Sequence, residues 1–222
     1  LLMLAEGGES VLFADGFDLV YGWNFAQELQ DVFAGKSTLS ALYKVHNQEY
    51  KGIPTGKQRL RYSTNHDLAA EKSPLEVYKN ERGAMAAFVI SSMLGGTPLI
   101  YSSQEVAYDR PLSFFEYTSI DWSSNAAYLN EYKQLMQIYD SSATLREGIL
   151  KTYETGNVAS FYYKNEENGL LVMVNTTDEM LTVKTPIERA GDDMKNLMTG
   201  EVIILPMALS LEPYQYYIWE KE

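Results

Sequence analysis

Short apolar segments alternate with stretches of helical periodicity over the first two thirds of the chain, and this alternation limits the possible folds more than any other feature. Strands are predicted at residues 1–6, 17–21, 59–64 and 97–101. Apolar residues at helical spacing predict helices that end near residue 35, run from 37 to about 48, run from 73 to about 95, and include 128–139. Strands that alternate with helices are typical of βα units around a parallel sheet.

The pattern changes near Gly148. Seven short strands, separated by turn signals such as Asn168-Gly169, are predicted at residues 158–164, 169–175, 179–184, 194–198, 201–205, 207–211 and 214–219. Such closely spaced strands are typical of a small antiparallel sandwich. The predicted fold class is therefore α/β: the second half of a (β/α)8 TIM barrel (strands 5–8) over residues 1–147, followed by a small all-β sandwich over residues 148–222.

The charge balance limits the kind of partner. The chain has 30 acidic and 18 basic residues, a net charge of −12 and no cluster of Lys and Arg. This argues against nucleic acid and against an anionic membrane surface, and it suits a neutral, polyhydroxylated ligand. No apolar run approaches the ~20 residues of a membrane span, so no membrane partner is expected.

The amino terminus predicts that the chain is a piece of a longer protein. Leu1-Leu-Met-Leu-Ala5 reads as a buried strand, without an initiator Met or the features of a signal peptide. The localisation stays open among secreted, periplasmic and cytoplasmic, because zero cysteines do not decide the compartment. Two barrel edges without neighbours would also favour self-association of such a fragment.

Two carboxylates follow predicted strands. Glu6 comes directly after the first strand, and Asn65-His66-Asp67 follows the third. In a parallel barrel the carboxyl ends of the strands form the active face, so these groups are expected to meet there. Two carboxylates on one rim are what acid-assisted cleavage of a glycosidic bond requires. The sequence therefore predicts a sugar-processing enzyme.

Several segments, in order and spacing, resemble the second half of the α-amylase family, glycoside hydrolase family 13. They are Glu6, Phe17-Asp-Leu-Val-Tyr21, Thr64-Asn-His-Asp67 and Gly96-Thr-Pro-Leu-Ile-Tyr101 with Gln104-Glu105. The segments 157–161 and 169–175 resemble the start of that family's carboxyl-terminal sandwich. Gly7-Gly-Glu-Ser10 and Ser102-Ser103 depart from the family's pattern.

The resemblance implies a retaining hydrolase of α-glucans such as starch, maltooligosaccharides or pullulan. It implies that Glu6 is the general acid/base, that Asp67 stabilises the transition state and that His66 binds sugar hydroxyls. The family's nucleophilic Asp belongs to a strand that would precede Leu1, so this chain alone is expected to be inactive. No metal site and no cofactor are predicted for this chain, although calcium is possible in the part of the family's barrel that it lacks.

Alternatives remain open at this point. Glu6 and Asp67 could be a solvated carboxylate and a turn or capping residue, and His66 could be structural. Among the aromatic residues Trp23, Tyr101, Phe114, Phe115, Tyr117 and Trp122, one or two are expected to be sugar platforms. The rival functions are an α-glucan transglycosylase or isomerising relative, and a non-catalytic amylase-like module for glucan binding or scaffolding.

Overall fold

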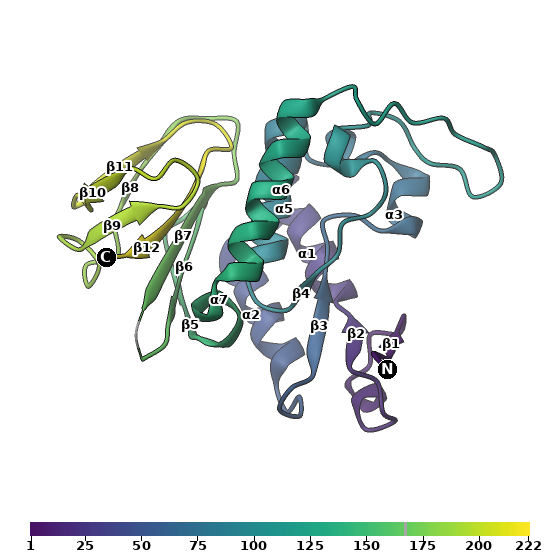
Figure 1. The fold of residues 1–222 in the computed structure, drawn as a ribbon, viewed down its shortest axis with the longest axis horizontal. Helices are drawn as coiled ribbons and strands as arrows, with labels where there is room; N and C mark the ends of the chain where they lie inside the picture. The colour runs from purple at the N-terminus through teal and green to yellow at the C-terminus, as the bar shows by residue number, and fades with distance from the viewer. Residues whose placement is uncertain (167) are drawn as a thin grey trace.

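The computed structural model describes residues 1–166 and 168–222 and opens with a four-stranded parallel sheet (Figure 1). Its strands lie side by side in chain order: β1 (Leu4–Ala5), β2 (Leu19–Tyr21), β3 (Gln58–Arg61) and β4 (Thr97–Pro98). All four predicted strands form, but each is shorter than predicted. The residues after each strand leave the sheet as loops and short helices, which is where the candidate site lies.

Helices connect the parallel strands. The main ones are α1 (Trp23–Phe33), α2 (Leu39–Tyr50), α5 (Glu81–Met93) and α6 (Ala126–Ser141). Short helices are α3 (His66–Glu71), α4 (Pro74–Val77), α7 (Ala143–Glu147) and the 3₁₀ turns η1 (Ser10–Phe13) and η2 (Gln104–Val106). Between β1 and β2 the described chain has the 3₁₀ turn η1 and no α-helix. None of the helices in the described residues is long and apolar enough to cross a membrane.

The single helix predicted over residues 73–95 is wrong, because the chain breaks into α4 and α5. Ser73 caps α4, since its hydroxyl accepts from the Glu76 amide at 3.2 Å, and Ser-Pro with a Glu three residues after the Ser is a sequence signature of such a start. Lys79 then adopts a left-handed conformation at φ +80°, which no helix interior tolerates. Asn80 starts a new helix by accepting from the Gly83 amide at 2.9 Å.

The carboxyl-terminal part is an antiparallel β structure of two sheets, as predicted. The six-stranded sheet has the order β10-β9-β12-β7-β6-β5, and β8 pairs with β11 separately. The strands are β5 (Ile149–Tyr153), β6 (Val158–Lys164), β7 (Gly169–Asn175), β8 (Leu181–Lys184), β9 (Asp193–Asn196), β10 (Val202–Ile204), β11 (Ala208–Leu211) and β12 (Tyr216–Lys221). The sequence missed β5, an edge strand whose side chains are exposed or half-buried and therefore lack an apolar face.

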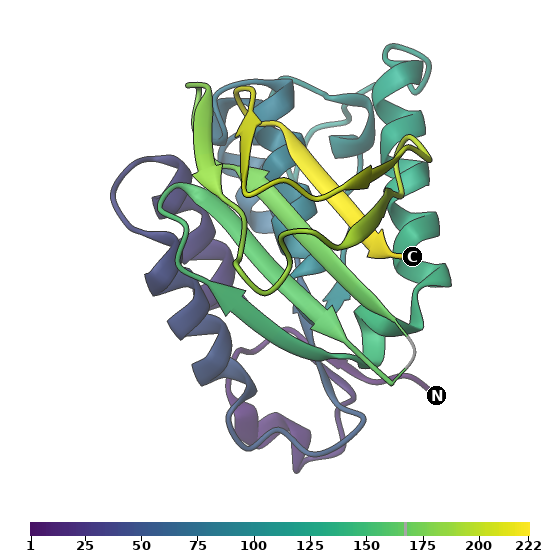
Figure 2. The same ribbon diagram turned by 90° about the vertical axis from the view of Figure 1, so that its left-hand side faces the viewer.

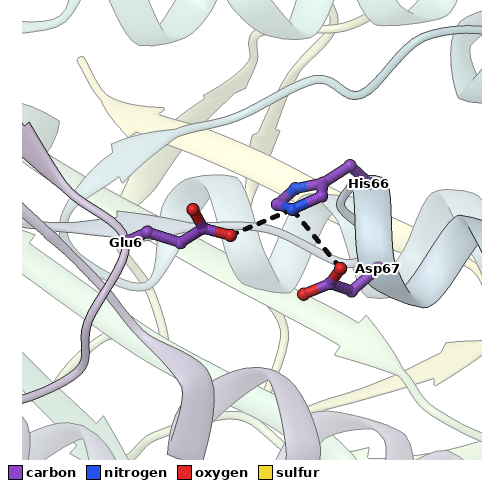
Figure 3. A group of neighbouring side chains, drawn as sticks. All are labelled: Glu6, His66 and Asp67. Carbon is purple, nitrogen blue, oxygen red and sulfur yellow. Dashed lines mark ion pairs between the residues drawn. The ribbon is translucent and has the colours of Figure 1, made fainter. Parts of the chain in front are cut away.

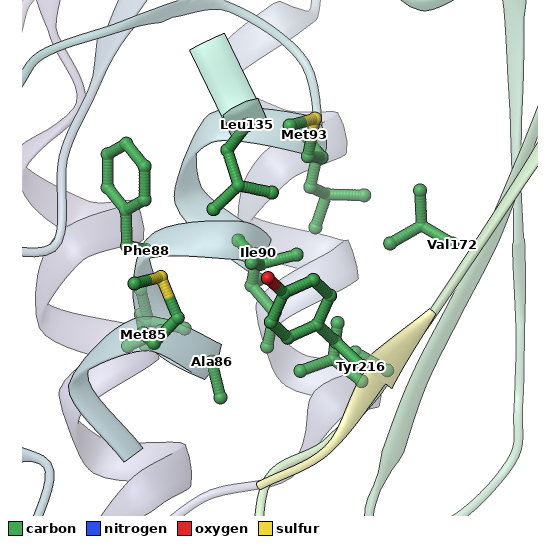
Figure 4. Packing of buried hydrophobic residues seen from close by; sticks show 14 of the residues in the cluster. Met85, Ala86, Phe88, Ile90, Met93, Leu135, Val172 and Tyr216 are labelled. Carbon is green, nitrogen blue, oxygen red and sulfur yellow. The ribbon is translucent and has the colours of Figure 1, made fainter. Parts of the chain in front are cut away.

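The six-stranded sheet packs on both faces, and Figure 2 shows helices behind it. Successive residues of a strand point to opposite sides of the sheet. In β7, Leu170, Val172 and Val174 pack against the barrel helices, whereas Leu171 and Met173 face the rest of the sandwich. Figure 4 shows Val172 and Tyr216 beside α5 and α6. The division into residues 1–147 and 148–222 stays a prediction, since both parts share this core.

The core position of Trp219 predicts that the β structure is a stabilising layer. Its side chain is fully buried and stacks on Tyr217 with ring centroids 4.4 Å apart. We expect Trp219→Ala to lower the free energy of unfolding by about 3–5 kcal/mol, as for other buried aromatic truncations. Urea unfolding measures this; an unchanged midpoint combined with lost adsorption to starch would instead make the β structure a glucan-binding module.

The parallel sheet has two open edges, which predicts self-association. Within the described chain β1 and β4 each pair on one side only, and Leu1, Leu2 and Leu4 are exposed beside β1. Unpaired strand edges next to apolar side chains favour pairing between copies. Light scattering at micromolar concentration should therefore show dimers or larger species of the 222-residue chain, and a strictly monomeric chain would contradict this.

Candidate active site

Glu6, His66 and Asp67 meet at the carboxyl ends of β1 and β3 (Figure 3). The His66 Nε2 atom lies 2.9 Å from Glu6 Oε1 and 3.4 Å from Asp67 Oδ1. The three side chains remain accessible, with Glu6 62% and Asp67 52% exposed. The structure thus brings together the three residues that the sequence analysis proposed for the site, although they come from segments some sixty residues apart.

The helix α3 holds His66 and Asp67 in place. Asn65 is fully buried and caps this helix, because its side-chain oxygen accepts from the Leu68 amide at 2.9 Å. His66 and Asp67 are the first two residues of α3, directly after this cap. The structure therefore gives the capping role to Asn65, and the Asp67 carboxylate faces Glu6 and His66.

Two side chains fix the turn that carries Glu6. The Trp23 indole donates to the Glu6 carbonyl at 2.8 Å. The buried Arg59 donates to the Gly8 carbonyl at 2.7 Å and to the Ser10 hydroxyl at 2.6 Å. Because Arg59 belongs to β3, it ties the turn after Glu6 to the strand that leads to His66. Sequence reasoning gave Arg59 no role.

A second buried arginine ties β3 to helix α2. The Arg61 guanidinium is hydrogen-bonded to the Glu49 carboxylate, lies 3.3 Å from His46 Nδ1 and stacks over the Phe25 ring at 4.1 Å. It also donates to the Gly95 carbonyl at 3.2 Å. Residues 59–64 were predicted as an apolar strand. Arg59 and Arg61 alternate with Leu60 and Tyr62, and this alternation indicates a strand with one polar face.

The environment of His46 predicts an acid-sensitive fold. Burial, reinforced by the Arg61 charge, lowers its pKa from 6.5 to about 3. As the pH falls from about 6.5 towards 3, the unfolded chain binds a proton that the folded chain does not, so stability is lost in this window. We expect His46→Asn to remove about 1–3 kcal/mol of the acid destabilisation between pH 6.5 and 4.5. Urea unfolding at both pH values tests this; an unchanged pH dependence would contradict it.

Three aromatic rings, those of Tyr21, Trp23 and Tyr62, pack together next to Glu6 and Asp67. Tyr21 lies with its ring centroid 5.4 Å from both Trp23 and Tyr62. Burial, and then the negative charges of Glu6 and Asp67, raise the pKa of the Tyr21 phenol, so it stays a protonated hydrogen-bond donor. Trp23 and Tyr101, two of the candidate sugar platforms, are only half-exposed.

The carboxylates of Glu6 and Asp67 lie close to each other. The closest ligand oxygens of Glu6 and Asp67 lie within 4.8 Å of each other. Two like charges this close repel each other, and the His66 Nε2 atom lies within 3.4 Å of an oxygen of each carboxylate.

One imidazole and two carboxylates are also a donor set that a divalent cation such as Zn²⁺ accepts. In the described residues the group consists of these three side chains alone, all at least partly exposed. Exposed acidic groups commonly gather without an ion. The expectation that this chain holds no metal site therefore stays a prediction.

The fold is similar to that of α-amylases of known structure. The maltogenic α-amylase AmyB from Thermotoga neapolitana matches all of this chain with 54% of its own length, at TM-score 0.84 and 17% identity. An α-amylase from Lactobacillus plantarum matches 99% of the chain with 55% of its length, at TM-score 0.83 and 17% identity. AmyP in complex with maltose matches 99% of the chain with 55% of its length, at TM-score 0.78 and 16% identity.

Over its whole length the chain therefore has the fold of the carboxyl-terminal half of an α-amylase, which confirms the predicted fold class and resemblance. It spans about half the length of each of these structures. No known protein family and no curated protein matches the sequence. The likeness at these identities concerns the fold, so the roles of Glu6, His66 and Asp67 rest on the site's own geometry.

Proposed function

We propose that this chain is part of a retaining glycoside hydrolase that acts on α-glucans. The observation that carries the proposal is that Glu6, His66 and Asp67 converge at the carboxyl ends of parallel strands in an α-amylase fold. In such barrels this end is where catalytic groups are found. A relative in fold, AmyP, has been crystallised with maltose, which supports an α-glucan as the ligand.

Each side chain has a role that its position allows. Glu6 protonates the oxygen of the leaving sugar and later deprotonates the attacking water. Asp67 stabilises the positive charge that develops on the sugar ring at the oxocarbenium-like transition state. His66 lies between the two carboxylates and donates to hydroxyls of the same ring. The nucleophile comes from barrel strands outside these 222 residues.

Hydrolysis and transglycosylation use the same carboxylates and differ in whether water or a sugar hydroxyl accepts the glycosyl group. The non-catalytic alternative is less favoured, because a module that only binds glucan has no need for two carboxylates and an imidazole in contact.

The anomeric form of the product tests this proposal. A protein that contains this chain with the remaining barrel strands is mixed with a maltooligosaccharide, and the new reducing ends are followed by proton NMR. Retention predicts that the α-anomer appears first and that the β-anomer grows only through mutarotation. Initial release of the β-anomer would contradict the retaining mechanism, and absence of cleavage would contradict the enzyme assignment.

A further inference from the structure

One segment of the active face carries all the exposed aromatic side chains of the protein. The chain has eight Phe, 17 Tyr and three Trp, and the described residues include every one of them. Only Phe114, Phe115, Tyr117 and Trp122 are exposed. Phe115 and Tyr117 are 96% and 95% exposed. Such a concentration of open rings in one loop is the kind of exposed apolar patch that marks a binding surface.

The loop is continuous with the candidate active site. The Phe114 ring lies with its centroid 6.2 Å from the His66 ring and 6.2 Å from the Phe115 ring. The Leu112 amide donates to the Ala69 carbonyl at 2.8 Å, which anchors the loop to α3, the helix that begins with His66. The rings thus extend outward from the group that faces Glu6 and Asp67.

Local hydrogen bonds shape the loop while its rings stay in solvent. The Ser113 hydroxyl accepts from the amides of Phe115 and Glu116 at 3.1 and 3.2 Å. Farther along, the Asp121 carboxylate accepts from the amide and hydroxyl of Ser123 at 2.9 and 2.6 Å. The loop is therefore arranged without the rings collapsing onto the core, which reduces the ordering cost of a ligand that stacks on them.

We propose that the segment Phe114–Trp122 is a stacking surface for an α-glucan chain, with Phe114 and Phe115 contacting the sugars next to the one held by Glu6, His66 and Asp67. This inference rests on the proposed function, because it takes the glucan as the ligand of that site. Sugar rings present C–H faces to the negative face of an aromatic ring. The charged side chains within the segment, Glu116 and Asp121, are acidic and accept sugar hydroxyls, whereas an anionic ligand would be repelled.

Binding of maltoheptaose to the 222-residue chain, measured by isothermal titration calorimetry, tests the proposal. We expect Phe114→Ala and Phe115→Ala each to weaken binding about five-fold, as for the loss of one aromatic contact. Phe115→Trp should retain the affinity because it keeps a ring. Ile187→Ala removes an apolar side chain that is 76% exposed, in the turn between β8 and β9, and should change nothing. Phe115 is 96% exposed, so its truncation removes no buried contact that the fold needs.

Unchanged affinity in both alanine variants, or no binding of maltoheptaose by the wild-type chain, would overturn the proposal. So would variants that abolish self-association in sedimentation experiments while leaving sugar affinity intact, because the surface would then be a protein interface. The binding assay does not depend on turnover. If Glu6→Gln hydrolyses glucan normally while the ring variants bind weakly, the catalytic roles fail and the stacking surface stands.

Discussion

Glu6→Gln is expected to lower the turnover of maltooligosaccharides by about 10²–10⁴-fold in a protein that contains this chain with the remaining barrel strands, because general acid catalysis contributes that much. Asp67→Asn is expected to lose about 10²–10³-fold, the range seen when one transition-state-stabilising group is removed. Both groups act mainly in the transition state, so kcat should fall far more than substrate affinity. Steady-state kinetics on a chromogenic maltooligosaccharide measures these losses.

A neighbouring carboxylate provides the matched control. Glu9 is exposed and lies three residues beyond Glu6, on the same turn. Glu9→Gln should leave turnover unchanged, because in the described part of the chain Glu9 is not part of the group that Glu6 forms with His66 and Asp67. Near-normal turnover of Glu6→Gln or Asp67→Asn would remove that residue from the mechanism, and a large loss in Glu9→Gln would show that the wrong carboxylate of the turn was chosen.

Arg61→Leu is expected to lower the free energy of unfolding by about 3–5 kcal/mol, because breaking a buried ion pair leaves the other charge without compensation. Arg61 is 1% exposed, and its partner Glu49 is also buried. The substitution should also loosen β3, the strand that leads to His66. Urea unfolding of the 222-residue chain measures the effect.

The ion pair between Lys72 and Glu76 is the control for Arg61. It joins the C-cap residue of α3 to α4, four positions along the chain, and both side chains are more than half exposed. Lys72→Met should change the unfolding free energy by at most about 0.5 kcal/mol, since such surface pairs contribute little. An Arg61→Leu variant as stable as Lys72→Met would contradict the view that the buried arginines hold the active face together.

Much of the architecture follows from periodicity in the sequence. The apolar strands before Glu6 and Asn65 predicted that two carboxylates distant along the chain would share one end of a parallel sheet, and they do. This works because parallel strands all end at the same edge. The cap at Ser73 was also predictable, since Ser, Pro and a Glu three residues later form a local signature.

Other features depend on tertiary contacts and were missed. The edge strand β5 lacks an apolar face, so alternation could not reveal it. The break of the predicted helix at Lys79 depends on Asn80 competing as a second cap. The buried partners of Arg61, Glu49 and His46, come from helix α2, which lies before β3 in the chain and packs beside it only in the folded protein.

The aromatic candidates show a third kind of limit. Their composition suggested sugar platforms, but exposure separates Phe114, Phe115, Tyr117 and Trp122 from the half-buried Trp23 and Tyr101. No pattern in the sequence distinguishes an exposed aromatic ring from a half-buried one, because the exposure depends on which other residues pack against the ring in the folded protein.

The central claim is that Glu6 protonates the leaving sugar, and a change of leaving group tests it most directly. Fluoride leaves as an anion without being protonated, whereas the oxygen of a leaving sugar has to be protonated as it departs. The ratio of kcat/KM for Glu6→Gln to that of the wild type is therefore compared on a maltooligosaccharide and on α-maltosyl fluoride. We predict a loss of about 10²–10⁴-fold on the oligosaccharide and at most about ten-fold on the fluoride. An equally large loss on both substrates would contradict the claim, because Glu6 would then support the site without acting as its acid.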